Sequence, residues 1–162
     1  MSTTTTNQAA AAATAPSAGG NPPLPFVLGL SGLIPFWALA LALVTGWPHA
    51  LPSSEAAGLL ATYAATILSF LGGIRWGAAV ATPDQRRVAT DYVFGVTPQL
   101  FGWGALVLPD PWRFVVLAIG VLALGPIDRN LVARGLAPDW FGRLRMLLSL
   151  GAGAALFVAA FA

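Results

Sequence analysis

The sequence predicts an all-α membrane protein, a bundle of five transmembrane helices that follows a disordered N-terminal tail. Composition is the first reason, because 57% of the 162 residues are hydrophobic and 9% are charged, with a mean hydropathy of +0.75. A soluble domain carries about 25% charged residues, so this chain lacks the polar surface to face water on all sides. The second reason is a series of five apolar stretches, and the third is the clustering of arginines between them.

Residues 1–23 form the predicted tail. They include no charged residue, no aromatic residue and no β-branched aliphatic residue. Such a segment buries too little apolar area to offset the entropy of ordering it, so we expect disorder. The segment also lacks the positive region and leucine-rich core of a signal peptide and the arginines of a mitochondrial presequence. We therefore expect a dispensable extension.

Five apolar stretches follow the tail, and each is interpreted as one membrane-spanning helix. They cover residues 24–47, 56–81, 92–108, 112–127 and 146–162. A helix needs about 17–25 residues to cross the hydrocarbon core. The last three stretches have only 17, 16 and 17 residues, so flanking residues must extend them. Aromatic residues typical of membrane interfaces lie near the ends of the stretches: Trp47, Tyr92, Trp112 and Trp140.

Arginines predict the orientation of these helices. Six of the eight lie in the segments after the second and fourth stretches: Arg86, Arg87, Arg129, Arg134, Arg143 and Arg145. The segments on the other side, 47–55 and 109–112, hold none, although Arg113 lies just inside the fourth stretch. Cytoplasmic loops carry the excess of basic residues, so the N-terminus is predicted to be cytoplasmic and the C-terminus outside. This clustering accounts for a pI near 9.9 without nucleic acid as a partner.

The residue types offer no visible catalytic, cofactor-binding or metal-binding set, so we expect a protein that is not an enzyme. The chain has no cysteine and one histidine, His49, in an outer loop. That leaves neither a thiolate site nor a bis-histidine centre. Ser31, in the sequence GLSG, resembles the serine of an intramembrane protease. A continuous helix would separate it from His49 by about 27 Å, too far for a nucleophile and its base.

The second stretch carries a row of small residues at every fourth position. The row consists of Ala57, Ala61, Ala65, Ser69, Gly73, Gly77 and Ala81. Such rows let helix backbones approach closely in lipid, and their drift around the helix requires a partner that crosses at an angle. Two interpretations stay open: packing inside the bundle, or the seam of a homodimer. Prolines at positions 35, 98 and 126 predict kinks in the first, third and fourth helices.

Arg75 is the main polar candidate within a predicted span. It lies six residues before Ala81, or about 9 Å from the cytoplasmic end of the helix. Asp128 ends the fourth stretch on the same side, so an ion pair between the two is one interpretation. The others are simple snorkelling of the side chain and a site for an anion or a lipid phosphate. Gln99, just after Pro98, is expected to hydrogen-bond across the core.

Three motifs carry a family resemblance: LGLSGLIPF (28–36), YAATILSFLGGIRWG (63–77) and PQLFGW (98–103). They resemble the domain of unknown function 3429 family, the transmembrane protein 69-like small five-span membrane proteins. The resemblance covers about residues 24–160 and implies a bacterial member in the inner membrane. It implies no reaction and no catalytic residues. The signature element that it indicates consists of Ser69, Gly72, Gly73, Arg75, Trp76 and Gly77.

Two functions follow as hypotheses. The first is a non-enzymatic membrane scaffold or assembly partner, bound to another membrane protein or to a second copy of itself. The second is a small transporter or channel that binds an anion or lipid headgroup near Arg75. The chain shows no internal repeat of the kind that many transporters have, which favours the first.

Overall fold

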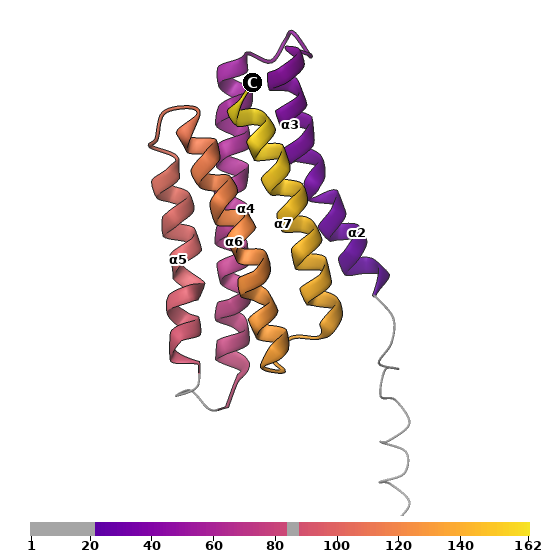
Figure 1. Cartoon of the computed structure of the whole chain (residues 1–162), viewed down its shortest axis with the longest axis vertical. Helices are drawn as coiled ribbons and strands as arrows, with labels where there is room; N and C mark the ends of the chain where they lie inside the picture. Colours follow the sequence, from indigo (N-terminus) through magenta and orange to yellow (C-terminus); the bar gives the residue numbers. More distant parts are fainter. Residues whose placement is uncertain (1–21, 84–87) are drawn as a thin grey trace, which may run out of the picture.

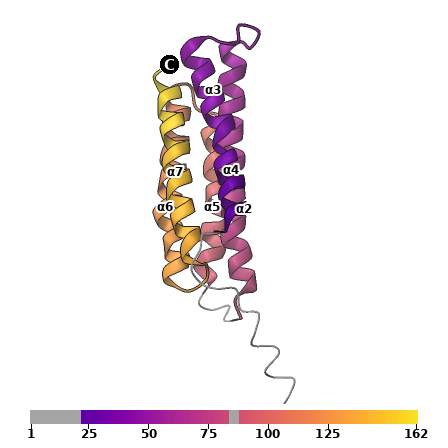
Figure 2. The same cartoon turned by 90° about the vertical axis from the view of Figure 1, so that its right-hand side faces the viewer.

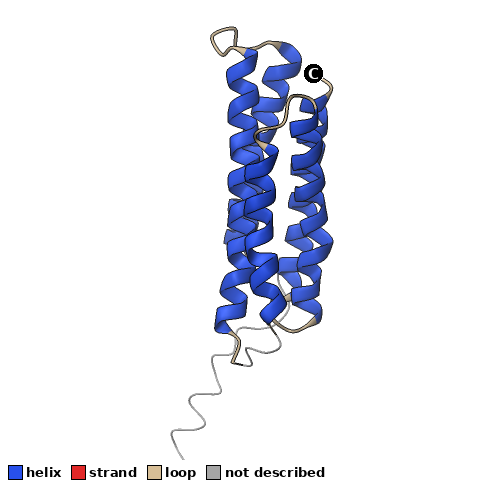
Figure 3. Cartoon of the chain, turned by 90° about the vertical axis from the view of Figure 1, so that its left-hand side faces the viewer, coloured by secondary structure: helices blue, strands red, loops and turns tan. Residues whose placement is uncertain are grey.

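The computed structural model describes residues 22–83 and 88–162, and within these ranges the chain is helical, with no strand (Figure 3). The helices are α2 (Pro23–Ser31), α3 (Leu33–Thr45), α4 (Ser53–Ala81), α5 (Ala89–Ala105), α6 (Trp112–Ala133) and α7 (Asp139–Ala160). The prediction of an all-helical protein is therefore confirmed for these ranges. The predicted tail lies outside them except for its last two residues, and Arg86 and Arg87 lie outside them as well.

Four segments are long and apolar enough to cross a membrane. They are Pro23–Thr45, Ser53–Ala81, Trp112–Ala133 and Asp139–Ala160. Helix α5, the predicted third span, has 17 residues and is shorter than these four. The membrane character of the chain thus rests on four candidate spans among the described residues.

Helices α6 and α7 extend beyond the apolar stretches from which they were predicted, as the shortness of those stretches requires. Helix α6 continues past residue 127 to Ala133, and α7 begins before residue 146, at Asp139. Arg129, Arg143 and Arg145, which the sequence analysis placed in a loop, are consequently helical. Arginine is a good helix former, and its charge does not end a helix when its side chain can reach water or a partner.

The predicted first helix is broken into α2 and α3 at Gly32. Pro35 explains the break, because it has no N–H for the carbonyl of residue 31 and its ring crowds that carbonyl. The hydroxyl of Tyr63 donates a hydrogen bond of 3.0 Å to the Gly32 carbonyl and anchors the break to α4. Below this point α2 diverges from α7 (Figure 1). Pro98 and Pro126, by contrast, lie inside the continuous helices α5 and α6.

The helices run up and down along the long axis of the molecule. Helices α4 and α5 lie side by side, as do α6 and α7, and α3 packs between α4 and α7 (Figures 1 and 2). The start of α2, the end of α4 and the α6–α7 turn lie at one end (Figure 1). The α3–α4 loop, the α5–α6 turn and the C-terminus lie at the other. This arrangement matches the alternation expected of successive membrane passes.

Large apolar side chains fill the interior and also cover the outside. Phe36, Leu60 and Leu117 are almost completely buried. Many others are exposed, among them Phe70 and Trp103, at 63% and 69%. A soluble monomer rarely exposes large continuous apolar areas, whereas hydrocarbon tolerates them. The surface therefore has the character of one that faces lipid.

The small-residue row of α4 changes its environment along the helix. Ala57 and Ala61 are buried in the core, whereas Gly73, Gly77 and Ala81 are exposed. The row drifts by about 40° per step, so it begins inside the bundle and ends on its surface. Packing inside the bundle therefore accounts for only the first half of the small-residue row.

A glycine outside this row, Gly72, makes a close contact between two helices. Gly72 of α4 faces Gly95 of α5 so tightly that an added Cβ at Gly72 would overlap the Gly95 carbonyl oxygen. The lack of a side chain at position 72 therefore sets the distance between α4 and α5.

We expect Gly72→Ala to lower the free energy of unfolding by about 1–3 kcal/mol, because the new methyl group forces the two backbones apart. Gly73→Ala is the matched control, since a Cβ there meets nothing within 4 Å. Denaturant titration of the full chain in detergent micelles measures both. Equal effects of the two substitutions would contradict the close contact.

Candidate functional site

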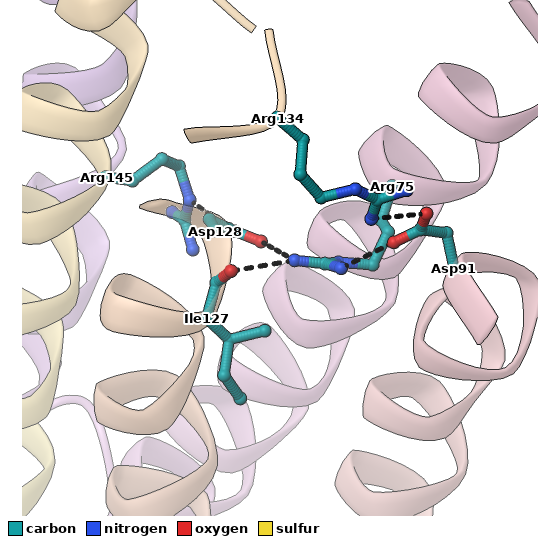
Figure 4. A network of polar contacts seen from close by, with 6 residues as sticks. All are labelled: Arg75, Asp91, Ile127, Asp128, Arg134 and Arg145. Atoms are coloured by element: carbon teal, nitrogen blue, oxygen red, sulfur yellow. Dashed lines mark hydrogen bonds and ion pairs between the residues drawn. The ribbon is translucent and has the colours of Figure 1, made fainter. Parts of the chain in front are cut away.

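Arg75 lies at the centre of a buried polar network (Figure 4). One terminal nitrogen, Nη1, donates to Asp91 Oδ1 at 2.8 Å. The other, Nη2, donates to the Ile127 carbonyl at 2.8 Å and lies 3.6 Å from Asp128 Oδ1. Arg75 of α4 is thereby connected to α5 and α6 at once. The side chain is 5% exposed, which excludes simple snorkelling, because a snorkelling arginine keeps its head in water.

Each of the two aspartates is shared with a second arginine. Asp91 Oδ2 accepts from Arg134 Nη1 at 2.7 Å. Asp128 Oδ2 accepts from Arg145 Nε at 2.8 Å. The result is an alternating chain of charges, drawn together in Figure 4: Arg134, Asp91, Arg75, Asp128 and Arg145. It joins α4, α5, α6 and α7.

Because these charged groups are buried, each of them needs an oppositely charged partner. A lone ion away from water costs many kcal/mol, and removal of one member leaves its partner uncompensated. Asp91 and Asp128 are only 1% and 3% exposed, yet each contacts two guanidinium groups. The Phe94 ring adds a cation–π contact, with its centroid 5.7 Å from Arg75 Cζ. The network is therefore a strong structural constraint on the relative positions of four helices.

Two arginine nitrogens within the network have no hydrogen-bond partner among the described residues. They are Arg75 Nε and Arg145 Nη2, and both are buried. Buried polar atoms are paired in most proteins, so such exceptions indicate a contact that the described residues do not supply. Of the two arginines, Arg145 belongs to the lining of a cavity between α2 and α7.

Part of this network follows from the sequence and part does not. Arg75 and Asp128 are predicted to lie at the same depth, and the two approach as described above. Asp91, the closer partner, is not predicted, because the predicted third span begins one residue later. Asp91 lies at the same predicted end as Asp128, so the depth argument that selected Asp128 applies to it equally. Arg134 and Arg145 were treated only as markers of orientation.

Gln99 does not lie where the sequence analysis expected it. Pro98 is buried and Gln99 is exposed. The prediction that Gln99 forms a hydrogen bond across the core is therefore wrong. Successive residues of a helix differ by about 100° in direction, and α5 turns the Gln99 side away from the bundle. The structure describes no hydrogen bond of the Gln99 side chain to any residue in 22–83 or 88–162.

The signature residues divide between the inside and the outside. Gly72 and Arg75 are buried, in the α4–α5 contact and the charge network. Gly73 and Gly77 are exposed, and Ser69 is half-buried. Trp76 is 44% exposed and packs edge-to-face against Tyr92 of α5, with centroids 4.9 Å apart.

The Ser31 side chain is not arranged as a catalytic nucleophile. Its hydroxyl donates a hydrogen bond of 2.8 Å to the Leu28 carbonyl one turn earlier. Serine commonly makes this local bond in membrane helices.

Comparison with known proteins places this architecture in a family. The family model described as "Protein of unknown function (DUF3429)" matches residues 21–161. The chain belongs to this family. Two curated relatives carry the name "Transmembrane protein 69". The protein from Xenopus tropicalis is 35% identical over 130 residues, and the protein from Mus musculus is 30% identical over 127 residues.

The family membership predicted from the three motifs is thus confirmed, as is the character of the chain as a membrane protein. The alignments cover 76% and 75% of this chain, but 48% and 49% of the frog and mouse proteins. The chain therefore spans about half the length of the curated relatives that it matches. No solved structure matches it.

We expect Asp91→Asn to lower the free energy of unfolding by about 3–5 kcal/mol, because it leaves Arg75 and Arg134 facing a neutral amide in a buried site. Asp110→Asn is the control. It breaks an exposed pair with Arg113, for which a loss below about 1 kcal/mol is expected. Denaturant titration in detergent micelles compares the two variants, and similar losses would contradict a structural role of the network.

Proposed function

We propose that this DUF3429 protein is a non-enzymatic integral membrane protein that acts as an assembly or stability partner of another membrane protein. The observation that carries the proposal is an exposed glutamine at membrane depth, Gln99. Its amide lies in a groove that can accept a transmembrane helix. Three features support this function: the position of Gln99, the shape of the groove, and the contacts that already surround Arg75.

The groove lies between α4 and α5 on the outer face of the bundle. Its lining combines small residues, hydroxyl groups and the amide: Thr62, Ala65, Thr66, Ser69, Gln99, Leu100, Trp103 and Leu106. Small residues let another helix backbone come close, and polar side chains can bind it across the contact. Ala65 and Ser69 belong to the small-residue row, so the row passes through this groove.

Gln99 is deep in the predicted membrane. It is about 15 Å from the start of α5 at Ala89 and about 9 Å from its end at Ala105. In hydrocarbon no water is available for its amide, and an unmet polar group there is unfavourable. A helix seated in the groove would supply the missing donor or acceptor. That helix belongs to a different membrane protein.

The contacts of Arg75 favour a role as an assembly partner over a role as an anion transporter. A transported anion would compete with Asp91, Asp128 and the Ile127 carbonyl, which already surround the guanidinium group. Replacing those contacts in every transport cycle would break the polar contacts that Arg75 makes from α4 to α5 and α6. Arg75 is better suited to a permanent structural role.

We further propose five membrane passes in a bacterial inner membrane, with the N-terminus cytoplasmic and the C-terminus outside. The α6–α7 turn and the start of α2 lie at one end of the bundle, and the C-terminus lies at the other (Figure 1). The arginine-rich end is assigned to the cytoplasm by the positive-inside rule. Helix α5 is the fifth pass, which it makes with help from its flanking residues.

A pair of C-terminal fusions in a bacterial host tests this topology. Alkaline phosphatase, which folds only outside the cytoplasm, is expected to be active, and green fluorescent protein is expected to be dark. The reverse result would contradict the orientation or the number of passes, because removing one pass moves the C-terminus to the other side.

Crosslinking in native membranes tests the partner. A photoreactive residue at Leu100 is expected to capture a second membrane protein, and Gln99→Leu is expected to lower the yield by about three- to tenfold, the value of an interhelical hydrogen bond in a membrane. Thr97→Val is the control, since the Thr97 hydroxyl already donates to the Val93 carbonyl. Recovery of the chain alone, or only as a homodimer, would contradict the proposal.

A further inference from the structure

A second concavity lies on another side of the bundle, away from the α4–α5 groove. It has a volume of about 350 Å³ and is lined by residues of α2, α3, α4, α6 and α7. Its walls are mainly aliphatic and aromatic, with Phe36, Ile74 and Leu148 among them. Small-molecule sites in proteins have volumes of about 300–1,000 Å³, so this cavity can hold part of one ligand.

Arg145 is the charged residue in this lining. It is 4% exposed. Its Nε atom donates to Asp128, and its Nη2 atom has no hydrogen-bond partner among residues 22–83 and 88–162. In Figure 4 the terminal nitrogens of Arg145 point away from the Asp128 carboxylate. The cavity therefore combines an apolar body with a buried donor that has a positive charge.

The charge of Arg145 is only partly neutralised. Asp128 is its partner, but Asp128 also faces Arg75, so one carboxylate is divided between two cations. An anionic group at Nη2 would complete the hydrogen bonding and the charge of Arg145 together. Phosphate and arginine are well matched for such a contact.

The opening of the cavity indicates where its occupant comes from. Leu28 and Phe70 belong to its lining and are 62% and 63% exposed. Both lie on faces that meet the bilayer, so the cavity opens sideways into lipid. Arg145 is about 9 Å along α7 from Asp139, close to the level at which lipid headgroups end. From there the lining continues along α7 to Ala152, toward the middle of the membrane.

We propose that this cavity binds one anionic phospholipid of the surrounding bilayer. One acyl chain lies between α2 and α7, against the lining of Ile74 and Leu148, and the phosphate lies beside the guanidinium group of Arg145. The second chain stays in the bilayer at the opening. The bound lipid fills the space where α2 diverges from α7 and holds α2 to the bundle. This site is independent of the helix-binding groove, so either can fail without the other.

Native mass spectrometry of the full chain in detergent micelles tests the proposal, with dioleoyl phosphatidylglycerol, dioleoyl phosphatidylcholine or oleate as the added probe. The expected result is one retained phosphatidylglycerol per chain. Arg145→Gln is expected to lower its occupancy at least about tenfold, since it removes a charge-assisted hydrogen bond. Arg143→Gln, two residues away on an exposed position of α7, is the matched control and is expected to retain the lipid.

A second variant keeps the test decisive if Arg145→Gln does not fold. Gly29→Leu fills the cavity from α2 and leaves Arg145 and its partners unchanged. A Cβ at Gly29 meets only the ends of flexible side chains, Leu148 Cδ1 at 3.0 Å and Leu144 Cδ1 at 3.2 Å. Gly58→Leu, at a position with nothing within 4 Å, is its control.

Loss of the lipid in Gly29→Leu but not in Gly58→Leu supports the site. The proposal is overturned if Gly29→Leu and wild type retain the lipid equally. It is also overturned if phosphatidylcholine is retained as strongly as phosphatidylglycerol, or if oleate alone is retained.

Discussion

The structure depends on the burial of Arg75 between two aspartates. A guanidinium group in hydrocarbon must find negative charge and hydrogen-bond acceptors, and here Asp91, Asp128 and the Ile127 carbonyl provide them from two other helices. Helices α4, α5 and α6 can therefore adopt only relative positions that satisfy all three contacts. Arg145 extends the constraint to α7. Hydrophobic packing alone is weakly selective in lipid, because lipid tails pack against leucine as well as a helix does.

Around this fixed centre the two sides of the bundle differ in shape and lining. On the α4–α5 side, the Gly72–Gly95 contact brings two backbones together and leaves a groove beside them with Gln99 in its lining. On the α2–α7 side, the break at Gly32 lets α2 diverge and opens a cavity lined by Arg145. We propose that both open toward the membrane, the first for a partner helix and the second for a lipid. A rigid framework that presents two such surfaces is consistent with a partner in membrane assembly.

The sequence predicted the helices better than it predicted their ends or their faces. Composition and the lengths of apolar stretches were enough to locate the helical rods, and equal depth was enough to bring Arg75 near Asp128. Asp91 was missed because a search for apolar stretches stops at a charge, although a paired charge can lie inside a helix. Arg145 was missed for the same reason. The outward position of Gln99 could not be predicted, because the inward side of α5 is chosen by its neighbours, and those contacts exist only in the folded chain.

The central claim is that Arg75 and Asp91 stabilise the bundle through each other. A double-mutant cycle with Arg75→Gln, Asp91→Asn and the combined variant, measured as free energies of unfolding in detergent micelles, isolates their coupling. A coupling energy of about 1.5 kcal/mol or more is predicted for this buried, hydrogen-bonded pair. Additive effects, with a coupling energy near zero, would contradict the claim.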